Sequence, residues 1–191
     1  MDMAQEVKRR LTADDWAAAA LDALGEGGLA AVAVEPLAAR LGATKGSFYW
    51  HFANRDALVS AALARWEEVN TEAVIAAVEA IPDPVERLRT LFGTVIGKVE
   101  QGETEMNLLA TADHPLVAPV LARVTERRIG YVAMLFRELG FPADAAHSRG
   151  VLAYSAYLGH AQLARATPAV LPVGDGSRRY LDQVIETLVA R

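Results

Sequence analysis

Hydrophobic residues recur every three or four positions along almost the whole chain, with alanine-rich polar positions between them. This spacing matches the 3.6-residue period of an α-helix and places the apolar side chains on one face of each helix. No segment shows the alternation of β-branched and polar residues that a half-buried strand needs. The pattern therefore predicts an all-α protein.

Caps, glycines and prolines divide this pattern into separate helices. The strongest start signal is Asp83-Pro84-x-Glu86, which combines an N-cap, a first-turn proline and a Glu three residues after the cap. The expected helices run from a Thr12 cap to the glycines at 25–28, over about 34–41 and 45–52, from an Asn54 cap to about 80, over 84–100, around 106–109, over 116–139 and 142–165, and from 177 onward. The long fourth helix joins a head of three helices to a body of five.

Residues 35–56 have the layout of a helix-turn-helix: a short helix, a glycine turn and the cap of a second helix. Gly42 supplies the positive φ that ends the first of these helices, and the Thr44 hydroxyl can cap the next. The segment 44–56 gathers four aromatic and three basic residues, a composition typical of a surface that binds a phosphate backbone.

The segment LAARLGATKGSFYWHF at 37–52, followed by RDAL at 55–58, resembles the signature of the TetR family (TetR/AcrR-like) of bacterial transcriptional repressors. The resemblance covers about residues 11–60, and Ala33, Glu35 and Ala53 depart from the family pattern. It implies an N-terminal helix-turn-helix DNA-binding domain at residues 1–56 and a C-terminal ligand-binding and dimerisation domain at 57–191. In that family, a ligand in the body shifts the fourth helix and releases the operator.

We expect the third helix to read bases in the major groove. Gly46 allows close approach of the backbone, Lys45 suits a phosphate, and Ser47 can bond a base edge. Phe48 and Phe52 share a helix face and are expected in the core against Leu37, Leu41 and Leu58. The predicted DNA contacts are Thr44, Lys45, Gly46, Ser47, Tyr49, Trp50, His51 and Arg55.

The charge balance is not that of a typical DNA-binding protein, because the net charge is −5 and residues 1–56 hold six basic against eight acidic residues. Distribution matters more here, since Arg40, Lys45 and Arg55 cluster around the motif. The basic arm at 8–10 is either a solvated tail or a DNA contact. The chain has no cysteine, no signal-peptide pattern and no apolar run long enough for a bilayer, so we expect a cytoplasmic protein without membrane association.

The body offers no arrangement of nucleophile, base and acid, so we expect neither an enzyme nor a cofactor or metal site. It does carry large apolar and mixed-polarity side chains on amphipathic helices, which suit either a small-molecule cavity or an ordinary core. The resemblance favours the cavity, and we expect an apolar or weakly polar effector because no arginine is well placed among these positions. The predicted effector contacts are Trp66, Phe92, Ile96, Met106, Leu109, Tyr131, Met134, Leu135, Tyr154 and Tyr157.

The last two helices are predicted to pair with a second copy of the chain. Small residues in the middle of the 142–165 helix would allow another helix to approach closely. A monomer that folds these faces against its own body is the alternative. The predicted homodimer contacts are Arg149, Leu152, Ala153, Ala156, Gly159, His160, Leu163, Leu181, Val184, Ile185 and Leu188.

These observations predict a ligand-responsive, homodimeric repressor that leaves a palindromic double-stranded operator when a small effector binds. Dimerisation is favoured because one short recognition helix reads too few base pairs for specificity. A ligand-blind or architectural DNA-binding protein is the alternative, and an all-α enzyme is a remote one.

Overall fold

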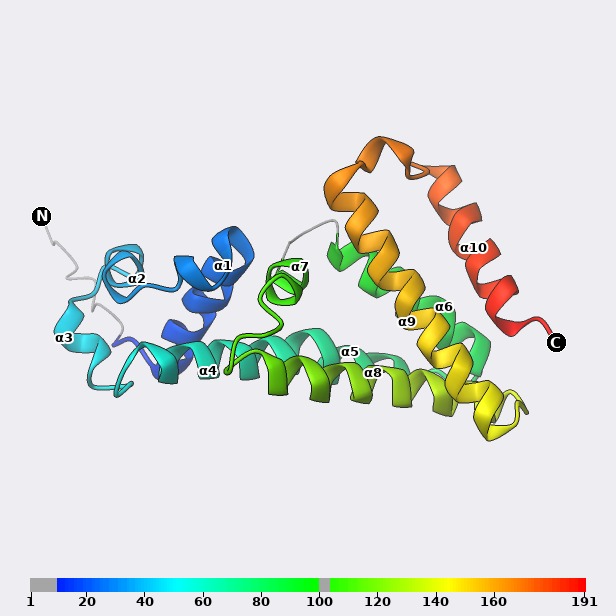
Figure 1. Ribbon diagram of the computed structural model, residues 1–191, viewed down its shortest axis with the longest axis horizontal. Helices are drawn as coiled ribbons and strands as arrows, with labels where there is room; N and C mark the ends of the chain where they lie inside the picture. Colours follow the sequence, from blue (N-terminus) through cyan, green and yellow to red (C-terminus); the bar gives the residue numbers. More distant parts are fainter. Residues whose placement is uncertain (1–9, 100–103) are drawn as a thin grey trace, which may run out of the picture.

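The computed structural model describes residues 10–99 and 104–191, and within these residues the chain forms helices and turns without any strand. The all-α prediction is confirmed. A head built on α1 to α3 lies at one end of an elongated molecule, and a bundle of longer helices forms the body (Figure 1). The elements are α1 (Ala13–Ala31), α2 (Val34–Arg40), α3 (Lys45–Phe48), α4 (Arg55–Glu67), the π-helical η1 (Glu68–Glu72), α5 (Ala73–Glu79), α6 (Pro84–Val99), α7 (Thr104–Leu109), α8 (Ala118–Glu138), α9 (Ala143–Ala166), the 3-10 turn η2 (Pro168–Val170) and α10 (Asp175–Val189).

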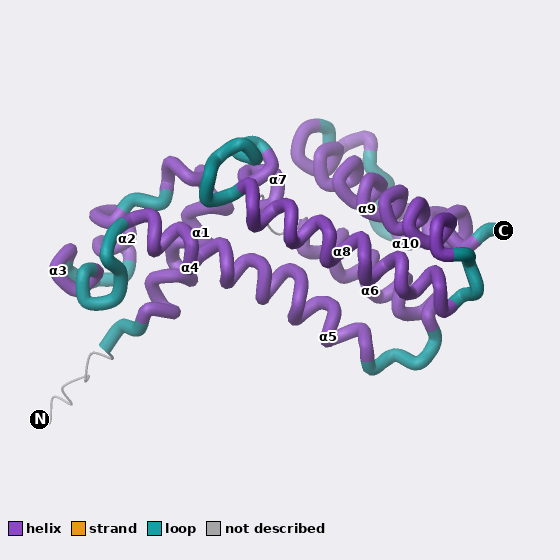
Figure 2. The backbone as a smooth tube through the Cα atoms, turned by 60° about the horizontal axis from the view of Figure 1, so that its bottom comes forward, coloured by secondary structure: helices purple, strands orange, loops and turns teal. Residues whose placement is uncertain are grey.

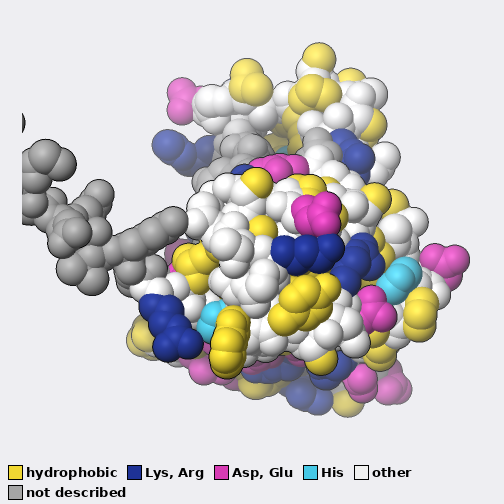
Figure 3. Space-filling model, turned by 90° about the vertical axis from the view of Figure 1, so that its left-hand side faces the viewer, with side chains coloured by type: hydrophobic (Ala, Val, Ile, Leu, Met, Phe, Trp, Pro, Cys, Tyr) yellow, Lys and Arg dark blue, Asp and Glu magenta, His cyan; other side chains and the backbone are white. Residues whose placement is uncertain are grey.

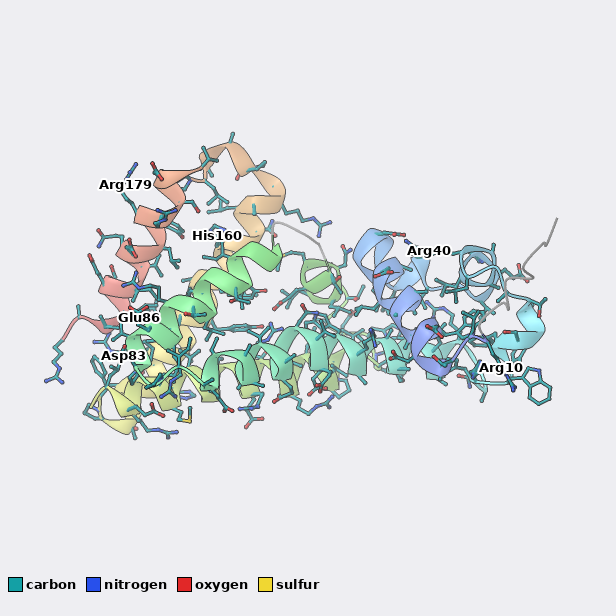
Figure 4. The ribbon with its side chains drawn as sticks, turned by 180° about the vertical axis from the view of Figure 1, so that it is seen from behind. Arg10, Arg40, Asp83, Glu86, His160 and Arg179 are labelled. Atoms are coloured by element: carbon teal, nitrogen blue, oxygen red, sulfur yellow. The ribbon has the colours of Figure 1, made fainter. Side chains whose placement is uncertain are left out.

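Three predicted helix starts are confirmed by their cap geometry. Thr12 and Asp15 form a reciprocal capping box at α1. The Asn54 side chain accepts a hydrogen bond from the backbone N–H of Ala57 at 2.9 Å. Asp83 Oδ1 accepts from the N–H of Glu86 at 2.8 Å, and both residues lie at the start of α6 (Figure 4). Each cap satisfies a backbone donor that the first turn of a helix leaves free.

The first helix breaks within the predicted glycine cluster, because Gly27 and Gly28 leave helical geometry and Gly28 has a φ of 66°; a short helical turn then continues to Ala31. One predicted boundary is wrong. The third helix ends at Phe48 instead of Phe52, because the N–H groups of Trp50 and His51 bond at shorter range, to Ser47 O at 3.3 Å and to Phe48 O at 2.9 Å. The fourth helix reaches α5 as expected, but through the π-helical segment η1, which no sequence signal marked.

The head and part of the body share one hydrophobic core. Phe48 is fully buried, as predicted, and its ring packs edge-to-face on Trp16 with centroids 5.4 Å apart. The same cluster takes in Leu58, Leu63 and Trp66 of α4, and it continues into α7 and α8. The core of the head therefore crosses the predicted domain boundary after residue 56. A displacement of α7 or α8 would shift the packing of side chains in the head, because close-packed side chains transmit strain.

A second hydrophobic cluster lies in the body, among α5, α6, α8, α9 and α10. The helices α4, η1 and α5 form one rod that runs beside α8 (Figures 1 and 2). Ion pairs join the two rods: Arg123 contacts Glu67 at 2.5 Å, and Arg127 contacts Glu72 at 3.0 Å. None of the described helices is both long and apolar enough to cross a membrane.

Candidate DNA-binding surface and effector cavity

The turn between α2 and α3 has the geometry of a helix-turn-helix. Gly42 adopts a φ of 59°, a conformation that side chains disfavour. The N–H of Ala43 then bonds back to Ala38 O at 2.8 Å. The Thr44 hydroxyl accepts from the N–H of Ser47 at 3.2 Å and so caps α3. The positive φ and these two bonds end α2 and begin the short helix α3, as the sequence predicts.

Two aromatic side chains project from the end of α3. Tyr49 is 56% exposed and Trp50 is 81% exposed, whereas the neighbouring Phe48 is buried in the core. The view onto this end of the molecule shows hydrophobic side chains that stand out beside Lys and Arg side chains (Figure 3). A large exposed aromatic group on a small helical head is typical of a contact surface.

The cations of this surface are paired with the protein's own carboxylates. Lys45 Nζ lies 2.7 Å from Glu35 Oε1, and both side chains are exposed. This hydrogen bond raises the pKa of Lys45 and lowers the pKa of Glu35. Arg40 donates two hydrogen bonds to Glu26, at 3.0 and 2.5 Å. DNA would have to replace these partners, and exposed pairs of this kind are weak enough to be replaced.

Arg55 is placed differently from the other predicted DNA contacts. Its Nε donates to Val32 O at 2.6 Å, and its Nη2 donates to Leu29 O. The guanidinium therefore ties the start of α4 to the link between α1 and α2. Thr44 and Gly46 are exposed, and Ser47 and His51 are half-buried. Arg10 of the basic arm is exposed, while Lys8 and Arg9 lie outside the described residues.

The body contains a cavity between the α5–η1 rod and α6, α8 and α9. The space open to the centre of a water molecule amounts to about 50 Å³, which is room for about three or four waters. Its walls are mostly apolar, with polar groups gathered near Arg128. The lining residues are Asn70, Thr71, Val74, Ile75, Leu91, Phe92, Val95, Arg128, Tyr131, Val132, Ala153, Tyr154 and Tyr157.

Four of the predicted effector contacts line this cavity: Phe92, Tyr131, Tyr154 and Tyr157. The others lie elsewhere. Trp66 and Leu109 belong to the cluster that the head shares with α7 and α8, Leu135 belongs to the body core, Ile96 and Met134 pack against that core, and Met106 is half-buried on α7.

The expectation that no arginine lies among the inward-facing positions is wrong, because Arg128 lines the cavity. A signal for it was present. Arg128 follows the buried Val124 by four residues and precedes the buried Tyr131 by three, so it falls on the buried face of α8.

Arg128 is held by three groups of the α4–η1 rod. Nε donates to Thr71 Oγ1 at 2.9 Å, Nη2 donates to Asn70 O at 3.1 Å, and the guanidinium carbon lies 5.2 Å from the centre of the Trp66 ring. Two of these groups, Asn70 O and the side chain of the buried Thr71, belong to the π-helical turn η1.

The remaining donor of Arg128 meets Glu105 of α7. Nη1 lies 2.7 and 2.9 Å from the two carboxylate oxygens, and the two side chains are only 13% and 11% exposed. Tyr154 and Tyr157 donate to the same carboxylate at 3.1 and 2.7 Å. Burial, followed by the charge of Glu105, raises the pKa of both tyrosines, so they remain protonated donors. Burial opposes the charge on Arg128, but the charge and hydrogen bonds of Glu105 outweigh it and raise the pKa of Arg128.

The predicted dimer contacts divide into two sets. Ile185 and Leu188 of α10 and Ala153 of α9 are buried in the body core, and His160 is buried with its ring stacked on Tyr180. Leu181, Val184 and Ala156 are half-buried.

Arg149 joins α9 to the end of α10, donating to Leu188 O at 2.7 Å and Ala190 O at 2.6 Å. In contrast, Leu152, Gly159 and Leu163 are exposed on one side of α9, beside the exposed Val151. That side is an apolar strip that no described part of the chain covers.

A helix-turn-helix head on an elongated helical body is an architecture found in DNA-binding transcription regulators. Residues 17–62 match the sequence profile described as "Bacterial regulatory proteins, tetR family". The N-terminal domain therefore matches the profile of the TetR family, and the resemblance inferred from residues 37–58 is confirmed.

Solved structures share the fold over nearly the full length. A TetR transcriptional regulator from Legionella pneumophila is 16% identical, with a TM-score of 0.75 over 98% of this chain and 97% of that one. AibR, solved in complex with isovaleryl coenzyme A and operator DNA, is 20% identical, with a TM-score of 0.67 over 93% and 97%. SmeT, the repressor of the Stenotrophomonas maltophilia multidrug efflux pump SmeDEF, is 19% identical, with a TM-score of 0.66 over 94% and 91%.

No curated protein sequence is significantly similar to the chain. Among the described residues, no three His, Asp or Glu side chains gather closely enough to hold a metal ion.

Proposed function

We propose that the protein is a ligand-responsive repressor that binds a palindromic operator as a homodimer and leaves it when a small molecule enters the body. The observation that carries this proposal is the continuity of one hydrophobic core from the recognition helix, through Phe48 and Trp66, to Leu108 of α7 and Val124 of α8. One of the helices that line the cavity, α8, is thereby packed against the head that holds the proposed DNA surface.

The head, residues 1–56, supplies the DNA contacts in this proposal. Thr44, Gly46 and Ser47 face base edges and backbone at the start of α3, and Lys45, Tyr49, Trp50 and His51 hold phosphates around them. Arg55 acts indirectly, because its guanidinium is engaged with the backbone of Leu29 and Val32.

The body, residues 57–191, binds the effector and forms the dimer. Leu152, Gly159 and Leu163 on the exposed strip of α9 meet their counterparts on the second copy, which spaces two recognition helices about one turn of DNA apart. The solved complex of AibR holds an acyl coenzyme A and operator DNA together with this fold. Such a regulator works where the bacterial chromosome lies, in the cytoplasm.

The proposal is tested with operator fragments selected from random duplexes. Lys45→Ala should weaken binding to every sequence and reduce the slope of log K against log salt by about one phosphate contact per subunit. Glu35→Gln, the matched variant on the other side of the pair, should tighten binding because it frees Lys45 and removes a negative charge. Sedimentation that finds only monomers at micromolar concentration, with and without DNA, would overturn the dimeric repressor.

The small size of the cavity favours one competing function, a ligand-blind DNA-binding protein. A space of about 50 Å³ is too small for a metabolite unless a side chain moves. Ligands that raise the thermal stability of the protein but leave its operator affinity unchanged would support this alternative.

A further inference from the structure

We propose that the effector is a small organic carboxylate with a compact apolar tail, and that its carboxylate binds by replacing that of Glu105 on Arg128, Tyr154 and Tyr157. This inference rests on the proposed function for its regulatory part. Its binding part stands on the geometry of the cavity.

The donors around Glu105 are held in place by other parts of the body. Thr71, the carbonyl of Asn70 and the Trp66 ring fix Arg128 without any help from α7. Tyr154 and Tyr157 extend from α9, with their rings 6.0 Å apart. If Glu105 withdrew, one guanidinium N–H edge and two phenol hydroxyls would still converge on the same point. That arrangement is a carboxylate site which the protein's own side chain occupies.

The charge of Arg128 decides which ligands can replace Glu105. A buried guanidinium that loses its partner is strongly destabilising, so only another anion can take the vacated place. A neutral amide or alcohol leaves the charge uncompensated, and an amine is repelled by it. Carboxylate oxygens also match the donors in number and direction, as the present contacts with Glu105 show.

The size of the cavity points the same way. With Glu105 in place, the space holds only a few water molecules, whereas withdrawal of this side chain adds its volume to the polar end. The head group would then lie at Arg128, and the tail would lie against Val74, Leu91 and Phe92, which form part of the apolar wall. The effector class expected from the sequence, apolar or weakly polar, thus becomes an anion with an apolar tail.

Displacement of Glu105 has a direct route to the head. Glu105 and Asn107 lie two residues apart on α7 and therefore face different sides. Asn107 Nδ2 donates to Leu24 O and Gly25 O of α1, each at 3.0 Å. Leu108 is buried in the core shared with the head. Glu105 thus holds α7 to Arg128 at the cavity, and Asn107 holds α7 to α1. A ligand carboxylate that displaces Glu105 from Arg128 would free α7 to shift and would weaken the contact of Asn107 with α1.

Calorimetry on the full chain with four six-carbon probes tests the binding step: hexanoate, hexanamide, hexanol and hexylamine. We expect only hexanoate to bind, and Glu105→Gln to tighten its binding by about tenfold or more because the internal competitor is gone. Glu126→Gln, an exposed change of the same kind on α8, is the control and should leave the affinity as it is. Tyr157→Phe should weaken binding several-fold in a folded protein.

Operator titration of the same variants tests the regulatory step. Hexanoate should lower the operator affinity of the wild type, and Glu105→Gln should lower it without any ligand. Equal binding of hexanamide and hexanoate, or no hexanoate binding to either protein up to about 10 mM, overturns the carboxylate site. Failure of the wild type to bind any operator overturns the proposed function instead, and leaves the calorimetric result standing.

Discussion

Replacing Arg55 with lysine separates two roles that a basic residue near a DNA surface can have. In the structure, the guanidinium donates to two backbone carbonyls at once, those of Leu29 and Val32. A lysine keeps the positive charge but lacks the planar fork, so it can satisfy one of these acceptors at best. A phosphate contact, in contrast, needs mainly the charge. Arg55→Lys should therefore destabilise the head while it preserves the salt dependence of DNA binding.

The size of the effect follows from the bonds. A hydrogen bond to a charged donor contributes about 1.5 to 3 kcal/mol. The Arg55 side chain is 40% exposed, so water can solvate part of the carbonyl that the lysine leaves without a partner. We therefore expect Arg55→Lys to lower the free energy of unfolding by about 1 to 2 kcal/mol. Arg55→Ala loses both bonds but removes a cation from a helix N-terminus, where the helix dipole disfavours it by about 0.3 to 1 kcal/mol. We expect a net loss of about 2 kcal/mol for the alanine variant.

Thermal unfolding measures this loss. For a chain of this length, 1 kcal/mol corresponds to about 2 to 4 °C, so the midpoint should fall by about 2 to 8 °C for Arg55→Lys. Arg40→Lys is the control, because its guanidinium bonds only the exposed Glu26, and its midpoint should stay nearly constant. If Arg55→Lys unfolds like this control while Arg55→Ala reduces the salt slope by one contact, Arg55 binds phosphate and the reasoning is refuted.

Three further predictions test the fold and its charges. Phe48→Ala should cost about 3 to 5 kcal/mol because the ring is fully buried. Trp50→Ala should leave the midpoint of unfolding almost unchanged and weaken operator binding, and the reverse pattern would contradict the assignment of Phe48 to the core and of Trp50 to the contact surface. Gly150→Ala should destabilise by about 1 to 3 kcal/mol, since its Cβ would lie 2.8 Å from a carbonyl oxygen of α8, whereas the same change at Gly130, with nothing within 4 Å, should not. The hydrogen bond from its arginine partner on α8 lowers the pKa of Glu67 below 4.5, so this pair stabilises the fold above that pH and the contribution is lost as the pH falls through the lowered pKa. Urea unfolding of the wild type and Glu67→Gln should accordingly differ at pH 7 and converge in acid.

The head could be predicted from the sequence because its signals are local. Thr12, Gly42, Thr44 and Asn54 act on backbone groups within a few residues, and each is found in the expected role. The length of α3 could not be predicted, since helical periodicity continues to residue 52 while the helix ends at Phe48, whose ring packs on Trp16 of α1. Propensity yields to tertiary contacts in such short elements.

The polar end of the cavity could not be predicted for a different reason. Arg128, Glu105 and Tyr157 come from three helices, and no spacing along the chain relates them. The π-helical turn that supplies Asn70 O is also invisible to a pattern of period 3.6. Apolar positions indicate that a residue is buried, but they do not distinguish a cavity wall from a filled core, which is why only part of the predicted effector set lines the cavity.

Both functional surfaces hold a cation that is already paired with a carboxylate of the same chain, Lys45 with Glu35 and Arg128 with Glu105. The consequences differ because the burial differs. The exposed pair contributes little to stability, so a phosphate can replace Glu35 at small cost, and DNA contacts can form and break readily even on an acidic protein. The buried pair cannot open without a substitute, since a lone buried charge is costly. Under the proposed function, Arg128 would therefore select for an anion of matching shape, and the two pairs together would make operator binding easy to reverse and effector binding selective.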